Sequence, residues 1–183
     1  MMLKYLKKAL KTGVVTGSDP LTPPDVDKNF RGKPEHDPSQ CIACSACMNA
    51  CPANALTVKT NLASGMQEWS LFLGRCIFCG RCEEVCPTHA IVLTPEVQMA
   101  VWCKDDLYQK AAFPLACCTE CNKPFAVEKE LQYAEDLLMA SGQYQDRDEL
   151  HRQLHTCPQC KRRHNITQSQ RINLSRLLRE PTL

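Results

Sequence analysis

Two cysteine runs of identical spacing constrain this chain more than any other feature of its sequence. Each run reads Cys-x-x-Cys-x-x-Cys-x-x-x-Cys-Pro, and the two runs begin at Cys41 and Cys76. In this spacing the first three thiolates can surround one iron–sulfur cubane, whereas the fourth ligates the neighbouring cluster. The sequence therefore predicts two [4Fe–4S] clusters that exchange their fourth ligands.

The two ligand sets follow from this exchange. Cluster one is expected to be held by Cys41, Cys44, Cys47 and Cys86. Cluster two is expected to be held by Cys76, Cys79, Cys82 and Cys51. The residues after each run also match in frame, as Cys-Pro-Ala-Asn-Ala and Cys-Pro-Thr-His-Ala, which indicates an internal repeat with a short strand after each copy. We expect a ferredoxin-like core over residues 31–98, including a hairpin that turns at Gly65.

The composition favours metal as the stabilising element of this chain. Aromatic residues make up 6% of it, so apolar packing alone gives a thin core. Most of the 14 cysteines stand in chelating Cys-x-x-Cys pairs, which are typical of metal sites rather than of disulfides. The sequence shows no secretory signal and no apolar run long enough to span a bilayer. We expect a protein that is loaded with metal in a reducing cytoplasm.

Residues 1–30 are expected to form a basic amphipathic helix followed by a proline-rich arm. Apolar side chains recur at helical spacing at Leu3, Leu6 and Leu10. Lysines cover much of the remaining surface, and Gly13 is expected to end the helix. Three interpretations stay open for residues 1–11: a segment that lies on an anionic membrane surface, a segment that lies on a partner's helix, and an ordinary solvated helix.

The segment 14–40 is expected to be extended, because its five prolines exclude a long helix. The stretch Phe30–Pro34 interrupts it with one aromatic residue and two cations, which suggests a docking point. A solvated linker is the alternative interpretation.

Two further cysteine pairs predict a four-thiolate site in residues 99–183. The expected ligands are Cys118, Cys121, Cys157 and Cys160. Such a set is typical of structural zinc, although a mononuclear iron uses the same ligands. Rubredoxin-like iron sites usually have glycine after each pair, whereas Asn122 and Lys161 stand there, which favours zinc.

Four other residues near these pairs are weaker candidates. Cys117 could substitute for Cys118, whereas His155 and His164 are expected to be exposed and without metal. Cys103 has no partner at chelating distance, so we expect a small buried or idle thiol.

The region between and after these pairs is expected to be helical. An apolar stripe from Val127 to Leu138, ended by Gly142, predicts one helix, and Asp146–Leu154 predicts a second. A third is expected around Ile172–Leu178. The fold class is therefore α+β, a two-[4Fe–4S] core between an N-terminal helix and a C-terminal helical module that a four-cysteine zinc-type site ties together.

The charge balance argues against a nucleic-acid-binding function. The formal net charge is +2, but two clusters and one zinc tetrathiolate would add about −6, which leaves the loaded protein near −4. The basic residues of the C-terminal segment 151–183 are not interleaved with aromatic ones. A zinc-ribbon regulatory protein is therefore disfavoured.

Several stretches carry a resemblance to a known family. They are Val26–Pro34, Cys79–Thr88, Ala100–Trp102 and Cys118–Ala126, with the late Cys-Pro-x-Cys pair. In these stretches the chain resembles the electron-transfer iron–sulfur subunit of formate hydrogenlyase and hydrogenase-4, a relative of the eight-iron ferredoxin subunit of respiratory complex I. The resemblance covers nearly the whole chain, and the C-terminal module makes it specific.

The resemblance implies an electron-relay subunit that is not itself catalytic. Electrons would pass from the formate dehydrogenase side to the small subunit of a [NiFe] hydrogenase. Its partners would be that small subunit, another iron–sulfur subunit and the membrane arm. The protein would then lie peripherally on the cytoplasmic face of the inner membrane, which favours the membrane-facing interpretation of residues 1–11.

One other electron-transfer function stays open at this point. The chain could be a ferredoxin-type subunit of another complex-I-like or 2-oxoacid oxidoreductase. A substrate-converting enzyme is less well supported, because the sequence has no phosphate-binding glycine loop, no nucleophile signature and no flavin or nicotinamide fingerprint.

Overall fold

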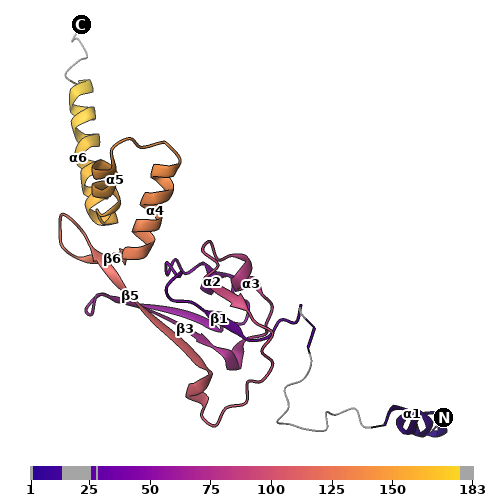
Figure 1. The fold of residues 1–183 in the computed structure, drawn as a ribbon. Coiled ribbons are helices and arrows are strands. Elements are labelled where there is room, and N and C mark those ends of the chain that lie inside the picture. Colours follow the sequence, from indigo (N-terminus) through magenta and orange to yellow (C-terminus); the bar gives the residue numbers. More distant parts are fainter. Residues whose placement is uncertain (1, 14–25, 28, 178–183) are drawn as a thin grey trace.

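The protein mixes helices and strands, with a sheet-based body, helices beyond one end of the sheet and an N-terminal helix (Figure 1). The computed structural model describes residues 2–13, 26–27 and 29–177, without the side chains of Met2 and residues 172–177. The strands are β1 (Pro34–His36), β2 (Leu56–Asn61), β3 (Met66–Phe72), β4 (Ile91–Leu93), β5 (Tyr108–Cys117) and β6 (Pro124–Val127). The helices are α1 (Met2–Thr12), α2 (Ala46–Ala50), α3 (Arg81–Glu84), α4 (Glu128–Ala140), α5 (Arg147–Leu154) and α6 (Pro158–Leu177), with short 3₁₀ turns at Leu73–Arg75 and Lys104–Leu107.

The main sheet is antiparallel, with strand order β2-β3-β5-β6. The predicted hairpin is confirmed, since β2 and β3 pair from Leu56↔Leu71 to Asn61↔Met66 and Gly65 lies in the turn with φ 65°. Successive residues of a strand face opposite sides, so Trp69 and Leu71 of β3 are both buried on the side of the cysteine loops. Phe72 lies on the other side and stacks on Tyr108, with ring centroids 4.5 Å apart.

One continuous core joins this sheet face to the cysteine loops. Its largest buried members are Leu56, Trp69, Leu71, Ile91 and Phe113. Six cysteines of the two runs pack against it in half-buried positions, which makes the core and the expected cluster sites one body. Burial of this apolar surface contributes the main favourable free energy of folding.

Residues 31–36 dock on this body, and we call them the strap. Strand β1 pairs with β4 through Glu35↔Val92. The backbone N–H groups of Gly32 and Lys33 donate to the carbonyls of Thr94 and Glu96, both at 2.9 Å. The docking point predicted from the sequence is therefore confirmed, and the surface on which it docks belongs to the protein's own ferredoxin-like body.

Strands β5 and β6 were not expected, and they change the start of the C-terminal module. The ten residues of β5 pair with β3 from Tyr108↔Phe72 to Pro114↔Met66, and then with β6 from Leu115↔Val127. The sequence hides this strand because it contains Pro114 and lacks a regular apolar alternation. Pro114 is tolerated where the pairing with β3 ends.

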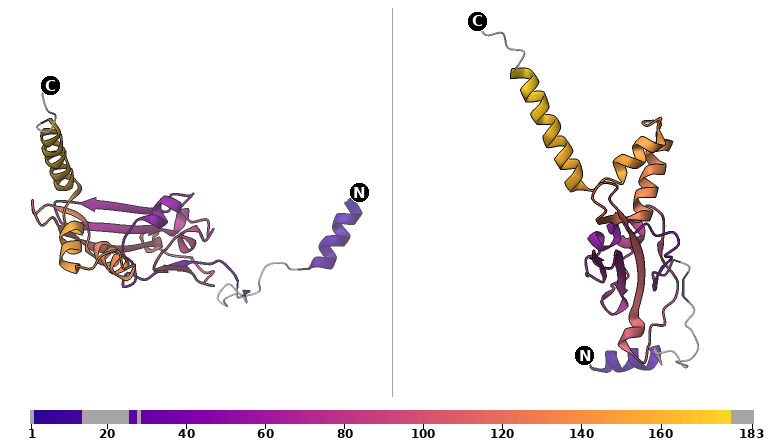
Figure 2. Two further views of the ribbon diagram at one scale, coloured as in Figure 1. Left: turned by 90° about the horizontal axis from the view of Figure 1, so that it is seen from above. Right: turned by 90° about the vertical axis from the view of Figure 1, so that its left-hand side faces the viewer.

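Helices α4 and α5 of the C-terminal module agree closely with the sequence prediction. Helix α4 is followed by Gly142 at φ 71°, and Asp146 caps α5 by accepting from the N–H groups of Asp148 and Glu149. Figures 1 and 2 show α4, α5 and α6 beyond the β6 end of the sheet. Helix α6 begins earlier than expected, at Pro158, and its residues 161–171 are exposed. The predicted apolar stripe from Ile172 onward lies outside the described side chains.

Helix α1 confirms the predicted amphipathic segment. It runs to Thr12, and the N–H of Gly13 donates to the carbonyl of Ala9. All described side chains of this helix are exposed, among them Leu3, Leu6 and Leu10. Its apolar face therefore packs against no other described element (Figure 1).

Candidate metal centres

Each predicted cluster ligand set lines one cavity. Cys41, Cys44, Cys47 and Cys86 surround cavity one, together with His36 and Trp69. Cys51, Cys76, Cys79 and Cys82 surround cavity two, together with Pro34 and Leu71. The chain thus brings together the two groups of four that the spacing predicted, including the exchanged fourth cysteine of each run.

Matching backbone conformations give the two loops their curvature. Ala43 and Phe78 hold equivalent places in the two runs, and both have left-handed φ, at 57° and 54°. Ser45 and Gly80 form a second matched pair, at 64° and 81°. Non-glycine residues rarely adopt this conformation, so its recurrence marks a backbone shape that surrounding structure enforces. The internal repeat is therefore a structural repeat as well.

Backbone N–H groups point at the sulfurs in the same repeated way. Ala43 N donates to Cys41 Sγ at 3.3 Å, and its counterpart Phe78 N donates to Cys76 Sγ at 3.4 Å. Ala55 N donates to Cys51 Sγ at 3.3 Å and Ala90 N to Cys86 Sγ at 3.2 Å. Donors aimed at sulfur stabilise thiolates, which are the form that ligates iron.

The electrostatics of the cavities suit a cationic centre. Burial raises the pKa of Cys41 and of Cys82 to about 11 in each case. Burial also raises the pKa of Cys86, but hydrogen bonds from the backbone and hydroxyl of Thr88 and from the N–H of Ala90 outweigh it, so this pKa is lowered. Thiols buried in this way become thiolates when a metal replaces their protons. The residues present therefore fit an iron–sulfur cluster in each cavity.

Three side chains around cavity one were missed by the sequence analysis. Trp69 Nε1 donates to Cys47 Sγ at 3.5 Å, and the indole stacks on His36 with ring centroids 3.8 Å apart. Thr88 Oγ1 lies 3.7 Å from Cys86 Sγ. A comparison of the two repeats could have singled out Thr88, because Ala53 stands at its place in the first copy. No sequence signal indicated His36, whose Nε2 is buried without a hydrogen-bond partner.

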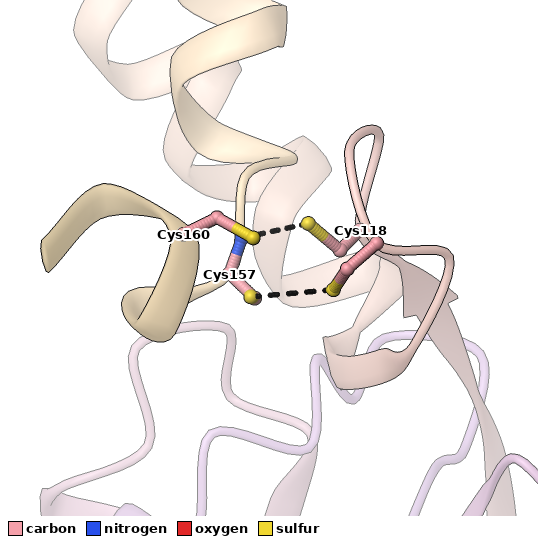
Figure 3. A group of neighbouring side chains, drawn as sticks. Cys118, Cys157 and Cys160 are labelled. Carbon is pink, nitrogen blue, oxygen red and sulfur yellow. Dashed lines mark hydrogen bonds between the residues drawn. The ribbon is translucent and has the colours of Figure 1, made fainter. Parts of the chain in front are cut away.

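The second predicted centre is also assembled. The sulfurs of Cys118, Cys121, Cys157 and Cys160 all lie within 4.8 Å of one another. Figure 3 shows Cys118 facing Cys157 and Cys160, so that the connection between β5 and β6 meets the start of α6. Cys157 N donates to Cys118 Sγ at 3.2 Å, and the sulfurs of Cys121 and Cys157 are 3.7 Å apart. Four converging thiols at the junction of two elements fit one tetrahedral metal ion.

Protons are unevenly held in this group of four. The hydrogen bond from the backbone N–H of Cys157 lowers the pKa of Cys118 to about 6. Burial, in contrast, raises the pKa of Cys160 far above its ordinary value. Cys118 therefore favours the thiolate form, whereas Cys160 holds its proton until a cation replaces it.

The four weaker candidate ligands differ in their exposure to solvent. Cys117 is exposed and lies outside the group of four. Cys103 is also exposed, which excludes the buried thiol and leaves the idle thiol of the two expected alternatives. His164 is exposed as expected and pairs with Glu120 at 2.8 Å. His155 was expected to be exposed and is instead 6% exposed. It stacks on His151 and lies beside Glu135 of α4.

The fold and the two four-cysteine cavities define a dicluster iron–sulfur protein. In agreement, residues 40–90 match a family model described as a 4Fe-4S dicluster domain. The chain is 56% identical over 180 residues to "Formate hydrogenlyase subunit 6" of Escherichia coli (strain K12), which covers 98% of this chain and 99% of that protein. The chain therefore belongs to the formate hydrogenlyase subunit 6 family.

A chain from the structure of the membrane-bound sulfane sulfur reductase, an archaeal respiratory membrane complex, is also similar. It is 29% identical, with a TM-score of 0.40 over 56% of each chain. Within the described residues of the present protein, no helix has the length and apolar character that crossing a bilayer requires.

Proposed function

We propose that this protein is a non-catalytic electron-relay subunit of a membrane-associated complex of the formate hydrogenlyase type. The observation that carries the proposal is the pair of neighbouring four-cysteine cavities. Cys47 of cavity one is close enough to Cys82 of cavity two for its charge to raise that thiol's pKa. When bound, a [4Fe–4S] cluster supplies a site that accepts and releases one electron. Two such sites on one rigid core suit a relay.

In this proposal, different residues bind the clusters, shield them from water and donate hydrogen bonds to their sulfurs. Cluster one is bound by Cys41, Cys44, Cys47 and Cys86, and cluster two by Cys76, Cys79, Cys82 and Cys51. Apolar neighbours such as Ile91 and Leu71 limit access of water to the sulfurs. Backbone N–H groups stabilise the thiolates. Burial and hydrogen bonding of this kind set where a cluster falls in the wide range of accessible potentials.

The partners in this proposal are those suggested by the relative's name and by the family resemblance. Electrons arrive from the formate dehydrogenase side, through another iron–sulfur subunit, and leave to the small subunit of a [NiFe] hydrogenase. The protein lies peripherally on the cytoplasmic face of the inner membrane, next to the membrane arm. Helix α1 supports this location through its exposed leucines and its lysines.

The C-terminal group of four cysteines is proposed to hold one structural zinc ion. Its thiols join the β5–β6 connection to α6 in a region with few other buried residues. Functionally, residues 1–30 attach the protein, residues 31–98 carry the electrons, and residues 99–183 form the metal-binding helical module. Strand β5 of this last unit continues the sheet of the second.

A single cysteine substitution tests the relay. C44S in the full complex should damage cluster one and abolish formate-dependent hydrogen production. C103S is the matched control, because Cys103 is an exposed cysteine outside all three groups. Hydrogen production at the wild-type rate in C44S cells, with the variant protein assembled in the complex, would reject the relay role.

Metal analysis tests the cofactors. Anaerobically purified protein should contain roughly eight irons and one zinc per chain. A ninth iron with no zinc would replace the zinc assignment by mononuclear iron.

A further inference from the structure

The internal repeat allows the surroundings of the two cavities to be compared position by position. Backbone donors occur in matched pairs, Ala43 with Phe78 and Ala55 with Ala90. Side-chain donors do not. Among the described residues, side-chain hydrogen bonds to the sulfur of a cluster cysteine occur only at cavity one, from Trp69 Nε1 to Cys47 Sγ and between Thr88 Oγ1 and Cys86 Sγ. The asymmetry is therefore confined to side chains.

The indole of Trp69 is held in position for this contact. Trp69 lies on β3 and is 1% exposed. The ring stacks on His36 of the strap with an angle of 18° between the planes. An indole nitrogen can only donate, so the interaction at 3.5 Å is an N–H···S hydrogen bond in either oxidation state of the cluster.

The direction of the second contact follows from ligand chemistry. As a cluster ligand, Cys86 is a thiolate without a proton, so the hydroxyl of Thr88 must be the donor. Thr88 is half-buried at the edge of cavity one. At the equivalent place beside Cys51, cavity two has Ala53, which has no donor.

We infer that Trp69 and Thr88 are positioning residues that raise the reduction potential of cluster one. This inference rests on the ligand sets of the proposed function. One-electron reduction adds one negative charge, which is shared between the cluster and its thiolates. Hydrogen-bond donors to these sulfurs stabilise the more negative, reduced state more than the oxidised one. Cluster two lacks both donors, so the effect acts on one member of the pair.

Redox titration of the anaerobic, full-length holoprotein, monitored by EPR spectroscopy, tests this role. C44S and C79S first assign the two signals, because each removes a ligand of one cluster. W69F and T88V should each lower the potential of cluster one and leave that of cluster two unchanged. The expected size is roughly tenfold in the reduced-to-oxidised ratio, or 59 mV for one electron. T88S keeps the hydroxyl and should titrate like the wild type.

The repeat also offers a reciprocal test. A53T places a hydroxyl beside Cys51 and should raise the potential of cluster two alone. Integration of the EPR signals measures cluster content in every variant, so a loss of cluster is not mistaken for a shift. If W69F loses cluster one through poor folding, the potentials of T88V and A53T test the inference instead, since Thr88 and Ala53 are only half-buried.

Two failures are distinguishable. Unchanged potentials in T88V and A53T, with both signals intact, would overturn the inference and leave the relay untouched. A wild-type protein with a single [4Fe–4S] signal would instead overturn the ligand sets, and with them the proposed function.

Discussion

Replacement of Gly32 by alanine should loosen the strap and expose both clusters. A Cβ atom at this position would lie 2.2 Å from the carbonyl oxygen of Glu96 and 2.6 Å from that of Thr94. These atoms belong to backbone, so no side-chain rotation relieves the overlap. The strap must move away from the body, although Gly32 itself has an ordinary φ.

The size of the effect follows from the contacts that are lost. The strap is held by Gly32 N to Thr94 O at 2.9 Å, Lys33 N to Glu96 O at 2.9 Å and Thr94 N to Lys33 O at 3.0 Å. At a net value of about 1 kcal/mol each, their loss lowers the free energy of opening by about 3 kcal/mol, so the open population rises roughly 100-fold.

An open strap withdraws one wall from each cavity, because Pro34 lines cavity two and His36 lines cavity one. We therefore expect G32A protein to lose its clusters to an anaerobic iron chelator roughly 100-fold faster, measured by bleaching of visible absorbance. G65A is the matched control. Gly65 has a left-handed φ and open space around its Cα, so alanine costs about 1 kcal/mol of local strain without a clash. Equal bleaching rates for G32A and G65A would refute this reasoning.

Three further predictions concern the flanks of the core. R147A should destabilise the contact between α4 and α5. Arg147 and His151 of α5 both bind the buried carboxylate of Glu135 of α4, at 2.6 and 3.0 Å. The rate of amide hydrogen exchange should therefore rise in these two helices and not in β3. These partners hold the pKa of Glu135 below its ordinary value. The stability that they contribute is complete at pH values above the ordinary pKa of a glutamate and is lost as the pH falls through the lowered pKa. If the acid unfolding transition of R147A coincided with that of the wild type, this explanation would be contradicted. C121S should release the proposed zinc and leave both [4Fe–4S] signals intact, as zinc and EPR measurements on one sample would report. L6D should weaken cosedimentation with anionic vesicles, whereas K33A, which removes a charge outside α1, should not.

The cluster sites were predictable because their information is local. Ligand spacing within a seven-residue loop is a direct consequence of the size of the cubane, and the exchange of the fourth cysteine follows from the position of Cys51 and Cys86 after their helices. The helices α4 and α5 were predictable for a similar reason. Gly142 and Asp146 mark their ends by backbone conformation and capping, which act within a few residues.

What the sequence did not reveal depends on partners far along the chain. Strand β5 exists because β3 offers it a free edge some forty residues earlier, a condition that no alternation in its own sequence records. His155 is buried beside Glu135 of α4, which lies twenty residues earlier in the chain, although its position next to a cysteine pair suggested an exposed side chain. The strap was indicated as a docking point, but its target required the register between Glu35 and Val92.

The strap gives the repeat an asymmetry that its cysteines lack. The two runs are related by equal spacing, matched left-handed residues and matched backbone donors, so within the repeat they differ only in side chains such as Thr88 and Ala53. The strap lies beside both cavities and brings a different side chain to each of them. At cavity one His36 stacks on Trp69, while Arg31 donates to the carbonyl of Cys79 at 3.0 Å beside cavity two. Surroundings that differ in this way give two clusters different reduction potentials. In this chain, a single docked segment outside the repeat can supply that difference without any change in the ligands.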